Sequence, residues 1–361
     1  MPYRKPDTPL RKGWTTGACA TAAARAAWQA LNGGGFPDPV SAHLPGGPSA
    51  PFALNRKELG EDHATASVIK DAGDDPDVTH GAEIVATVRR GDAGSGVTFR
   101  AGEGVGRVTL AGLPLAVGEP AINPKPREMI AANLASVSDS LGIACDVVVE
   151  IAIPGGAELA ARTANGRLGI VGGLSVLGTT GIVIPYSCAS WIHSIHRGID
   201  VARAAGIDHV AGSTGRTSEE AVRSLHGLSD QALIDMGDFA GGMLKYLRRH
   251  PVPKLTIAGG FAKLAKLADG QLDLHSSRSR INPALLARWL GESGGSEADC
   301  LAASEAVSAG QVLEIAGPLG PAIATRCALG ARETALAALS GDVQVDVLVI
   351  DRAGNTLAHV V

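Results

Sequence analysis

The first 153 residues of the chain combine two hydrophobic patterns. An alanine-rich run after Thr15 and Thr16 predicts a helix, because alanine is the best helix former and threonine can cap a first turn. Residues 83–90 and 97–100 alternate apolar and polar positions, which is typical of strands with one buried face. Residues 145–153 are almost wholly apolar and predict a buried strand. This mixture favours an α+β domain.

The middle of the chain changes to strands and helices in alternation. Short apolar runs at 182–185, 208–213 and 254–258 predict strands, and helical patterns at 187–205 and 216–225 separate them. Alternation of this kind predicts βαβ units with a parallel sheet. Turns at the C-terminal ends of such strands are where ligands usually bind.

The tail returns to a different order. Residues 283–339 are helical by pattern, and residues 343–351 and 356–360 predict a closing hairpin. We therefore predict an α+β fold with two domains. Residues 1–153 together with 271–361 form an α+β domain built from both chain ends, and a Rossmann-like α/β domain at 154–270 interrupts it.

Composition narrows the class of protein. Hydrophobic residues make up 45% of the 361 positions, enough for a sizeable core, and the net charge of −4 argues against a nucleic-acid partner. No uninterrupted apolar run approaches about 18 residues, so we expect no membrane partner. Residues Met1 to Lys12 are polar and charged with no apolar run after them, so we expect no secretory signal. The five cysteines are far apart and lack a C-x-x-C pair, which indicates reduced thiols in a cytoplasmic protein. The oligomeric state stays open, with a homo-oligomer as one option.

The N-terminal stretch from Arg11 to Thr21 places two glycines around two hydroxyls at a helix start. Free N–H groups there, with the helix dipole, can hold a carboxylate or phosphate. The structural alternative is an ordinary N-cap in a close-packed turn.

An acidic stretch from Asp71 to Ala82 gathers four carboxylates and His80 within ten positions. Clustered acids repel one another and hold protons more tightly than usual. The stretch could bind a divalent cation, handle protons or clamp an ammonium group. A solvated acidic turn is the structural alternative.

Prolines stiffen the loop that carries Glu119, Asn123 and Arg127, ahead of a helix that ends near Leu141. A stiff loop holds its side chains in place with little entropy loss on binding. A rigid connector explains the same composition.

Small residues crowd the segment from Asn165 to Gly181. It lacks the lysine of a P-loop and the spacing of a dinucleotide-binding turn, so tight packing explains it as well as ligand binding does.

Two smaller candidate sites lie further along the chain. A turn after a predicted strand contains Ser213, Thr214 and Gly215, and such a turn can take a nucleotide-like ligand. His275 is a lone histidine, a residue that is more often structural.

Four of these stretches together resemble the cobalt-precorrin-5B C(1)-methyltransferase family. They are Arg11 to Ala24, Asp71 to Ala82, Gly104 to Ile130 and Asn165 to Ser187. The block from Gly259 to Ser276 is similar to a further part of the family, but it has Gly260-Phe261-Ala262 where a Met-Ile-Gly-like run is usual. The resemblance implies a two-domain fold and transfer of a methyl group from S-adenosylmethionine to C-1 of a cobalt-corrin intermediate in cobalamin synthesis.

Chemistry and the resemblance lead to three sets of predicted site residues; the resemblance assigns no role to any single one. The predicted catalytic residues are Asp74, Asp75 and His80. The predicted substrate-binding residues are Arg11, Thr15, Thr16, Glu119, Asn123, Arg127 and His275. The predicted donor-binding residues are Gly178, Thr179, Thr180, Gly181, Ser213, Thr214, Gly215 and Glu219. We expect no metal held by the protein itself, and cobalt only as part of the corrin substrate.

Two other functions compete with this prediction. The cluster from Asp71 to Asp77 could serve a metal-dependent phosphoryl-transfer enzyme, although no Walker lysine is present. A non-catalytic corrinoid-binding protein would bind the ring without affinity for S-adenosylmethionine.

Overall fold

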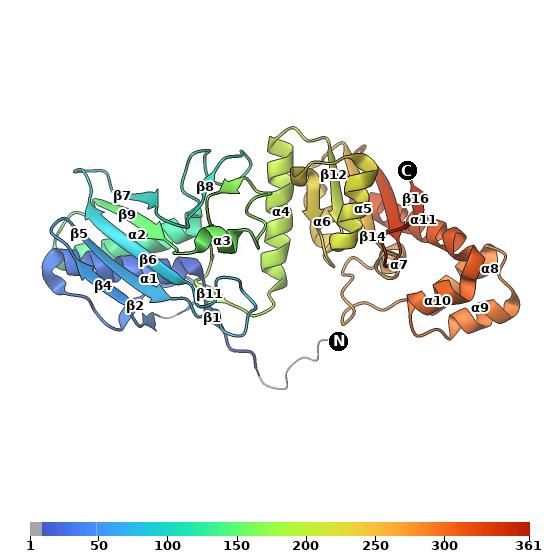
Figure 1. Cartoon of the computed structure of the whole chain (residues 1–361), viewed down its shortest axis with the longest axis horizontal. Helices are drawn as coiled ribbons and strands as arrows, with labels where there is room; N and C mark the ends of the chain where they lie inside the picture. The colour runs from blue at the N-terminus through green and yellow to red at the C-terminus, as the bar shows by residue number, and fades with distance from the viewer. Residues whose placement is uncertain (1–8, 48) are drawn as a thin grey trace. The chain divides into compact units, whose positions relative to one another are not determined.

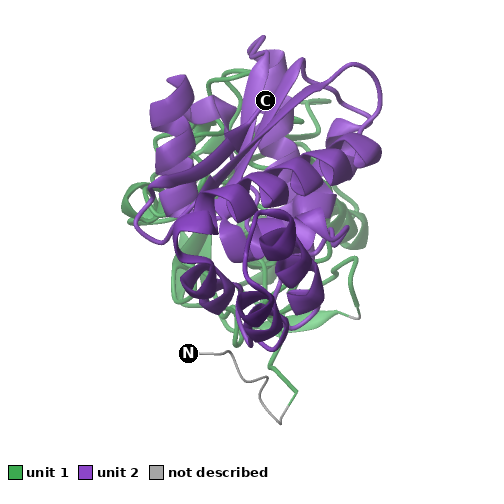
Figure 2. Ribbon diagram, turned by 90° about the vertical axis from the view of Figure 1, so that its right-hand side faces the viewer, with its two compact units in different colours: residues 1–188 green, residues 189–361 purple. Residues whose placement is uncertain are grey.

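The computed structural model describes residues 9–47 and 49–361 (Figure 1). The chain divides into two compact units, Met1–Cys188 and Ala189–Val361, which Figure 2 distinguishes by colour. Both units contain helices and strands, so the mixture of α and β structure predicted from the sequence is confirmed.

The predicted division into domains differs from this arrangement. Strand β15 (Gln344–Ile350) pairs in parallel with β14 (Lys254–Gly260) over its whole length. The C-terminal hairpin therefore lies in the same sheet as the segment that we predicted to be inserted. The pattern of apolar residues shows that a strand exists, but it does not show which strand will be its neighbour.

The first unit is built on a five-stranded sheet in the order β4-β5-β6-β9-β7. Its strands are antiparallel except for the parallel pair β7 and β9. The strands are β4 (Arg56–Leu59), β5 (His63–Ile69), β6 (Glu83–Arg90), β7 (Val97–Ala101) and β9 (Val147–Ala152).

Helix α1 (Thr16–Gln29) is the centre of this unit. Twelve of its residues are buried, since its alanines allow close approach to β5, β6 and α2 (Pro124–Leu141). A π-helical turn, η1 (Ala30–Gly34), ends it at glycines. Shorter elements complete the unit: β1 (Gly13–Trp14) pairs with β11 (Ile182–Val183), β2 (Val40–Ala42) with β3 (Ala50–Phe52), and β8 (Arg107–Val108) with β10 (Ile170–Val171), and α3 (Gly156–Ala160) follows β9.

The second unit holds a sheet in the order β13-β12-β14-β15-β16. Strands β12 (His209–Ser213), β13 (Leu233–Asp235), β14 and β15 are parallel, and β16 (Thr356–Val360) is antiparallel to β15. The predicted closing hairpin is thus confirmed. Because β13 and β14 flank β12 on opposite sides, the winding of the chain reverses next to β12.

Helices cover both faces of this sheet. Helix α5 (Arg216–His226) packs on Ala211, Ala258 and Leu348. The alternate residues of the same strands, such as Val210 and Ile257, face a larger core formed with the other helices. These helices are α4 (Cys188–Ala204), α6 (Ala240–Leu247), α7 (Phe261–Ala268), α8 (Pro283–Glu292), α9 (Glu297–Ser304), α10 (Ala309–Ala316) and α11 (Gly320–Ala338), with 3₁₀ turns η2 (Asp230–Ala232) and η3 (Gly317–Leu319).

Within the described residues, one stretch, Ala309–Ala338, is long and apolar enough to cross a membrane by length and composition. The chain divides it at η3 into α10 and α11. Helix α11 packs against α7, β15 and β16 in the core of the second unit. The core helix of a globular unit meets the same two criteria, so this stretch has a role in packing.

Candidate functional site

The predicted N-terminal and acidic stretches cross each other in the first unit. The amide of Trp14 donates to the carbonyl of Asp71 at 2.7 Å, and a Cβ on Gly13 would lie 2.0 Å from the carbonyl carbon of Ala72. Gly73, at φ +69°, returns the contact against the carbonyl of Arg11. Only residues without a side chain allow two backbones to approach this closely, so the two glycines join these stretches into one structure.

Lys70 organises the acidic turn from within. Its side chain is buried, with 2% of the residue exposed, and its Nζ donates to Asp77 and to the hydroxyl of Thr79. Burial opposes ionisation of Asp77, but the charge of Lys70 and the hydrogen bonds from Lys70 and Thr79 outweigh it and hold the pKa of Asp77 below its ordinary value. A buried ammonium therefore fixes the turn from which the predicted catalytic residues project.

The three predicted catalytic residues lie on this turn. Asp74 Oδ2 accepts from the amide of Arg11 at 2.6 Å, and Asp75 Oδ1 accepts from the amide of Tyr186 at 2.7 Å. His80 is exposed, and its Nδ1 accepts from the amide of Ala72 at 3.1 Å. An accepting Nδ1 places the proton of the neutral ring on Nε2. His80 therefore offers an N–H donor to solvent, and the carboxylates offer acceptors.

Arg11 pairs with an acid of the same turn. Its guanidinium contacts both carboxylate oxygens of Asp71, with Nη2 2.9 Å from Oδ1. This pairing and the hydrogen bond from the Gly73 amide lower the pKa of Asp71 to about 2. Arg11 thus contributes to an ion pair at the surface, where 59% of its side chain stays exposed.

Thr15 and Thr16 lie in an ordinary N-cap within a close-packed turn, which was the structural alternative to ligand binding. Both are buried, and Thr15 Oγ1 accepts from the amide of Ala18 as an N-cap. The amide of Gly17 is bonded to the carbonyl of Leu177 at 3.0 Å. The chain itself therefore satisfies two of the first N–H groups of α1, and ligand binding by these threonines stays a prediction.

Glu119 and Arg127 contact each other. Arg127 Nη2 lies 2.9 Å from Glu119 Oε2, and Arg127 also donates to the carbonyls of Ile122 and Pro120. Asn123 stands at the N-cap position of α2 but makes no capping hydrogen bond with its side chain. The stiff loop thus pairs two predicted substrate-binding side chains, Glu119 and Arg127. The side-chain amide of Asn123 makes no capping hydrogen bond to the helix.

The glycine-rich segment packs against the chain's own residues. A Cβ on Gly178 would lie 2.3 Å from Thr15 Oγ1, and one on Gly181 would lie 2.9 Å from Leu44. Thr180 Oγ1 donates to the carbonyl of Ile182 and accepts from the amide of the same residue. The absence of a side chain at Gly178 and Gly181 thus allows Thr15 and Leu44 to pack closely against this segment.

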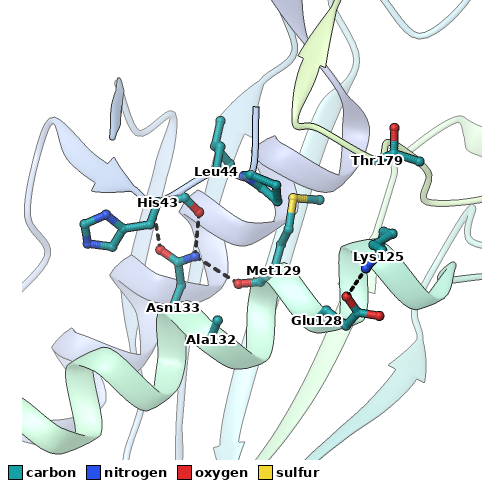
Figure 3. Close-up of a pocket in the computed structure, with 9 residues that line it drawn as sticks. His43, Leu44, Lys125, Glu128, Met129, Ala132, Asn133 and Thr179 are labelled. Carbon is teal, nitrogen blue, oxygen red and sulfur yellow. Dashed lines mark hydrogen bonds and ion pairs between the residues drawn. The ribbon is translucent and has the colours of Figure 1, made fainter. Parts of the chain in front are cut away.

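A pocket of about 390 Å³ opens beside this segment (Figure 3). Lys125 and Glu128 form an ion pair of 2.6 Å there. Asn133 Oδ1 accepts from the amide of His43, and Asn133 Nδ2 donates to the carbonyl of the same residue. The residues around the pocket are His43, Leu44, Pro45, Lys125, Glu128, Met129, Ala132, Asn133 and Thr179. Of the predicted donor residues, Thr179 alone borders it.

In the second unit, Ser213, Thr214 and Gly215 stand at the C-terminal end of β12, where the winding reverses. Ser213 Oγ is buried and has no hydrogen-bond partner within residues 9–47 and 49–361. Glu219 lies in the first turn of α5, which begins after Gly215 without a side-chain cap. In open α/β sheets, ligands bind in the crevice at such a reversal. A buried hydroxyl without a partner among the described residues is available to hydrogen-bond a polar ligand at this place.

Two lysines add positive charge to the same edge. Lys263 Nζ donates to the carbonyl of Thr214 at 2.9 Å and lies 3.0 Å from Asp238 Oδ1. Lys266 Nζ donates to the carbonyl of Leu274 at 2.8 Å, and burial lowers its pKa. The first contact ties the turn after β12 to α7, and the second ties α7 to the loop that follows it.

His275 lies on that loop, in the second unit. Its Nδ1 contacts Ser277 Oγ at 2.8 Å, and its amide donates to Asp273. The structure therefore does not place His275 in the same unit as the other predicted substrate-binding residues. It also distributes the predicted donor residues over both units, with Gly178 to Gly181 in the first and Ser213 to Glu219 in the second.

Comparison with known proteins identifies the family. The family model described as CbiD matches residues 3–185, and the CbiD C-terminal domain matches residues 273–360. The chain belongs to the CbiD family.

Named relatives span almost the whole chain. A cobalt-precorrin-5B C(1)-methyltransferase of Paramagnetospirillum magneticum is 60% identical over 96% of this chain and 97% of its own length. The protein of the same name from Bradyrhizobium sp. is 60% identical over 98% of this chain and 94% of its own. That from Brucella anthropi is 56% identical over 97% and 96%. A crystal structure of the cobalamin biosynthesis protein cbiD from Archaeoglobus fulgidus is 29% identical over 74% of this chain and 83% of its own, with a TM-score of 0.41.

Sequence reasoning about this CbiD-family chain missed Lys70, Asp238 and Lys263. Lys70 lies between an apolar strand and the acidic stretch, which was a usable signal, since a lysine in that position has acidic partners in reach. Asp238 and Lys263 come from different helical connections of the sheet. Nothing in the local sequence of either residue indicates the other.

Proposed function

We propose that this chain is an S-adenosylmethionine-dependent methyltransferase that methylates C-1 of cobalt-precorrin-5B to give cobalt-precorrin-6A in cobalamin biosynthesis. The observation that carries this proposal is the 56–60% identity, over nearly the full length, to relatives that bear this activity in their names. Cobalt enters as part of the substrate ring. We place the reaction in the cytoplasm, because all five cysteines are free thiols, as is usual in a reducing compartment.

We assign the donor to the C-terminal edge of the sheet in the second unit, and describe that unit as Rossmann-like. The turn after β12 offers Gly215 at the start of α5 and the Ser213 hydroxyl, which has no partner among the described residues. Glu219 supplies a carboxylate close by in sequence, suited to an ammonium or ribose hydroxyls of the donor. Gly178 to Gly181 pack on Thr15 and Leu44, so we now assign them to the acceptor side.

We assign the acceptor to groups of the first unit. The corrin intermediate carries several carboxylates, for which the N–H of His80 and the guanidinium groups of Arg11 and Arg127 are donors. Asn123, whose side chain does not cap α2, adds an amide. Both arginines are already paired with carboxylates, so a substrate carboxylate would have to exchange with Asp71 or Glu119.

The chemistry requires alignment above all. The sulfonium of the donor makes its methyl carbon electrophilic, and the methyl passes to the ring carbon as the carbon–sulfur bond breaks. The protein's residues hold the ring and exclude water, and alignment of this kind supplies roughly 7–11 kcal/mol in favourable cases. No nucleophilic serine or cysteine is required.

A base that keeps the ring nucleophilic is better sought in Asp74 or Asp75 than in His80. The Nδ1 of His80 is occupied by the amide of Ala72, so its neutral ring presents a proton rather than a lone pair. We therefore assign the acceptor role to the carboxylates and hydrogen-bond donation to His80.

The decisive experiment supplies cobalt-precorrin-5B with methyl-¹³C-labelled S-adenosylmethionine and locates the label on the ring by NMR. We expect label at C-1 and stoichiometric S-adenosylhomocysteine. Label at another carbon would refute the assigned position. Binding of the ring with no affinity for S-adenosylhomocysteine would favour a corrinoid carrier instead.

The phosphoryl-transfer alternative finds less support. The acids of the turn bond to the chain's own groups: Asp71 to Arg11, Asp74 to the Arg11 amide, and Asp77 to Lys70. Among the described residues, the one group of three side chains placed to hold a metal ion lies in the second unit. A requirement for added Mg²⁺ in turnover would revive this alternative.

A further inference from the structure

Three histidines surround a buried carboxylate at the N-terminal edge of the sheet in the second unit. Asp346 of β15 has no exposed surface. His209 begins β12, His226 ends α5, and His359 lies on β16. The residues thus come from two distant parts of the chain, β12 with α5 and the hairpin of β15 and β16. The three that stand on strands lie on the face of the sheet that α5 covers.

Hydrogen bonds already draw this cluster together. Asp346 Oδ2 lies 3.0 Å from His226 Nε2 and 2.9 Å from His359 Nε2. Thr256 Oγ1 donates to Asp346 Oδ1 at 2.8 Å and lies 2.7 Å from His209 Nε2. One ligand atom from each of His209, His226 and Asp346 lies within 4.8 Å of the other two.

We propose that His209, His226 and Asp346 bind a divalent transition-metal ion of the Zn²⁺ class. Imidazole nitrogen and carboxylate oxygen are ligands that such ions prefer. In a tetrahedral site with bonds near 2.0 Å, ligand atoms stand about 3.3 Å apart. The pair His226 and Asp346 is already near that spacing. The ligand atom of His209 lies within 4.8 Å of theirs and would move inward by rotation of its side chain when the ion binds.

The neighbours of the cluster fit this role. His359 holds the Asp346 carboxylate from the side as an outer hydrogen-bond donor, the position in which metal sites commonly orient their ligands. The side chain of His226 is 15% exposed and that of His359 is 26% exposed, so an ion can enter from solvent. Lys254 Nζ, 3.9 Å from Asp346 Oδ1, opposes a cation and must turn outward.

The site would be structural. His209 and Ser213 are opposite ends of β12, separated by roughly 13 Å of strand, so the ion would lie at the edge away from the turn assigned to the donor. An ion bound there would tie the end of α5 to β12 and β15. The site stands independently of the proposed methyl transfer.

The test uses the full chain, stripped of metal with a chelator and then titrated with Zn²⁺ or Co²⁺. We expect about one ion per chain, a rise in the unfolding temperature with Zn²⁺, and the visible absorption of four-coordinate Co²⁺. The variant pair His209→Ala and His226→Ala should lose the ion and the thermal shift. His193→Ala with His250→Ala, which removes two histidines of the same unit outside the cluster, should keep both.

His209 and His226 are both partly exposed, so their replacement should leave the fold intact. Circular dichroism checks that the variant is folded. Failure of the wild-type chain to retain an ion would overturn the proposal and leave a closed hydrogen-bonded network. Equal binding by the His209→Ala, His226→Ala variant would overturn it as well, since the ion would then occupy another place.

Discussion

At the scale of single residues, the sequence predicted candidate site residues but not what each of them contacts. Asp74, Asp75 and His80 do share one turn. Their partners are backbone amides of Arg11, Tyr186 and Ala72, and the first two are remote in sequence. Such contacts depend on how the chain crosses itself, so residue type and spacing could not predict them.

The pair of Arg11 and Asp71 leads to a prediction about pH. Because the pairing lowers the pKa of Asp71 to about 2, against an ordinary value of about 3.9, its stabilisation is present above the ordinary pKa and is lost as the pH falls through the folded one. The pair is largely exposed, so the gain in stability is small. In an NMR titration of ¹³C-labelled carboxyl groups, Arg11→Gln should move the Asp71 midpoint upward. A wild-type midpoint near 3.9 would contradict the pair.

The cysteines give a second prediction at this scale. Burial raises the pKa of the Cys19 thiol to about 12 against the opposing charge of Lys70, and burial also raises the pKa of Cys327. The thiolate is the reactive form. Iodoacetamide at pH 8 should therefore leave both thiols unmodified in the folded protein and alkylate all five after unfolding. Peptide mapping measures this, and labelling of folded Cys19 would show that α1 opens.

At the scale of elements, periodicity predicted the long helices and regular strands. The strand predicted at 83–90 and the hairpin of β15 and β16 are both observed. The short strands β2, β3 and β13 and helix α6 were not predicted. Strands of three residues carry too few positions to show a period, and the first two lie in a stretch rich in proline and glycine, typical of loops.

The crossing of β1 over the acidic turn gives the prediction for this scale. A Cβ on Gly13 meets backbone atoms of Ala72 and Gly73, which no rotamer change can relieve. Gly13→Ala should cost about 2–4 kcal/mol of unfolding free energy and displace the turn that carries His80. Gly166→Ala is the matched control, because nothing lies within 4 Å of its Cβ, and it should stay within about 0.5 kcal/mol of wild type. Denaturant titration distinguishes the two, and a tolerated Gly13→Ala would disprove the crossing.

At the scale of the whole molecule, the sequence predicted two domains but grouped residues 271–361 with residues 1–153, whereas the structure has them in the second unit. Residues 344–350 lie in the sheet of the second unit, in parallel register with β14. Parallel neighbours are joined by long crossovers, and here 83 residues separate the end of β14 from the start of β15, so no local signal reveals the partner. The reversal beside β12 became visible only when the strand order was known.

Because we assign the methyl donor to the second unit and the corrin acceptor to the first, a substitution in one unit should weaken the binding of one ligand only. Ser213→Ala removes a buried hydroxyl with no partner in the described chain, so stability should be unchanged or higher. If that hydroxyl binds the donor, calorimetry should show roughly five- to tenfold weaker S-adenosylhomocysteine binding.

In the first unit, His80→Gln should keep the affinity for S-adenosylhomocysteine and reduce kcat/KM for the corrin about tenfold. Ser224→Ala on the exposed face of α5 and His63→Gln in the first unit should leave both quantities unchanged. Weakened donor binding in His80→Gln, or unchanged binding in Ser213→Ala, would contradict the assignment of donor and acceptor to different units.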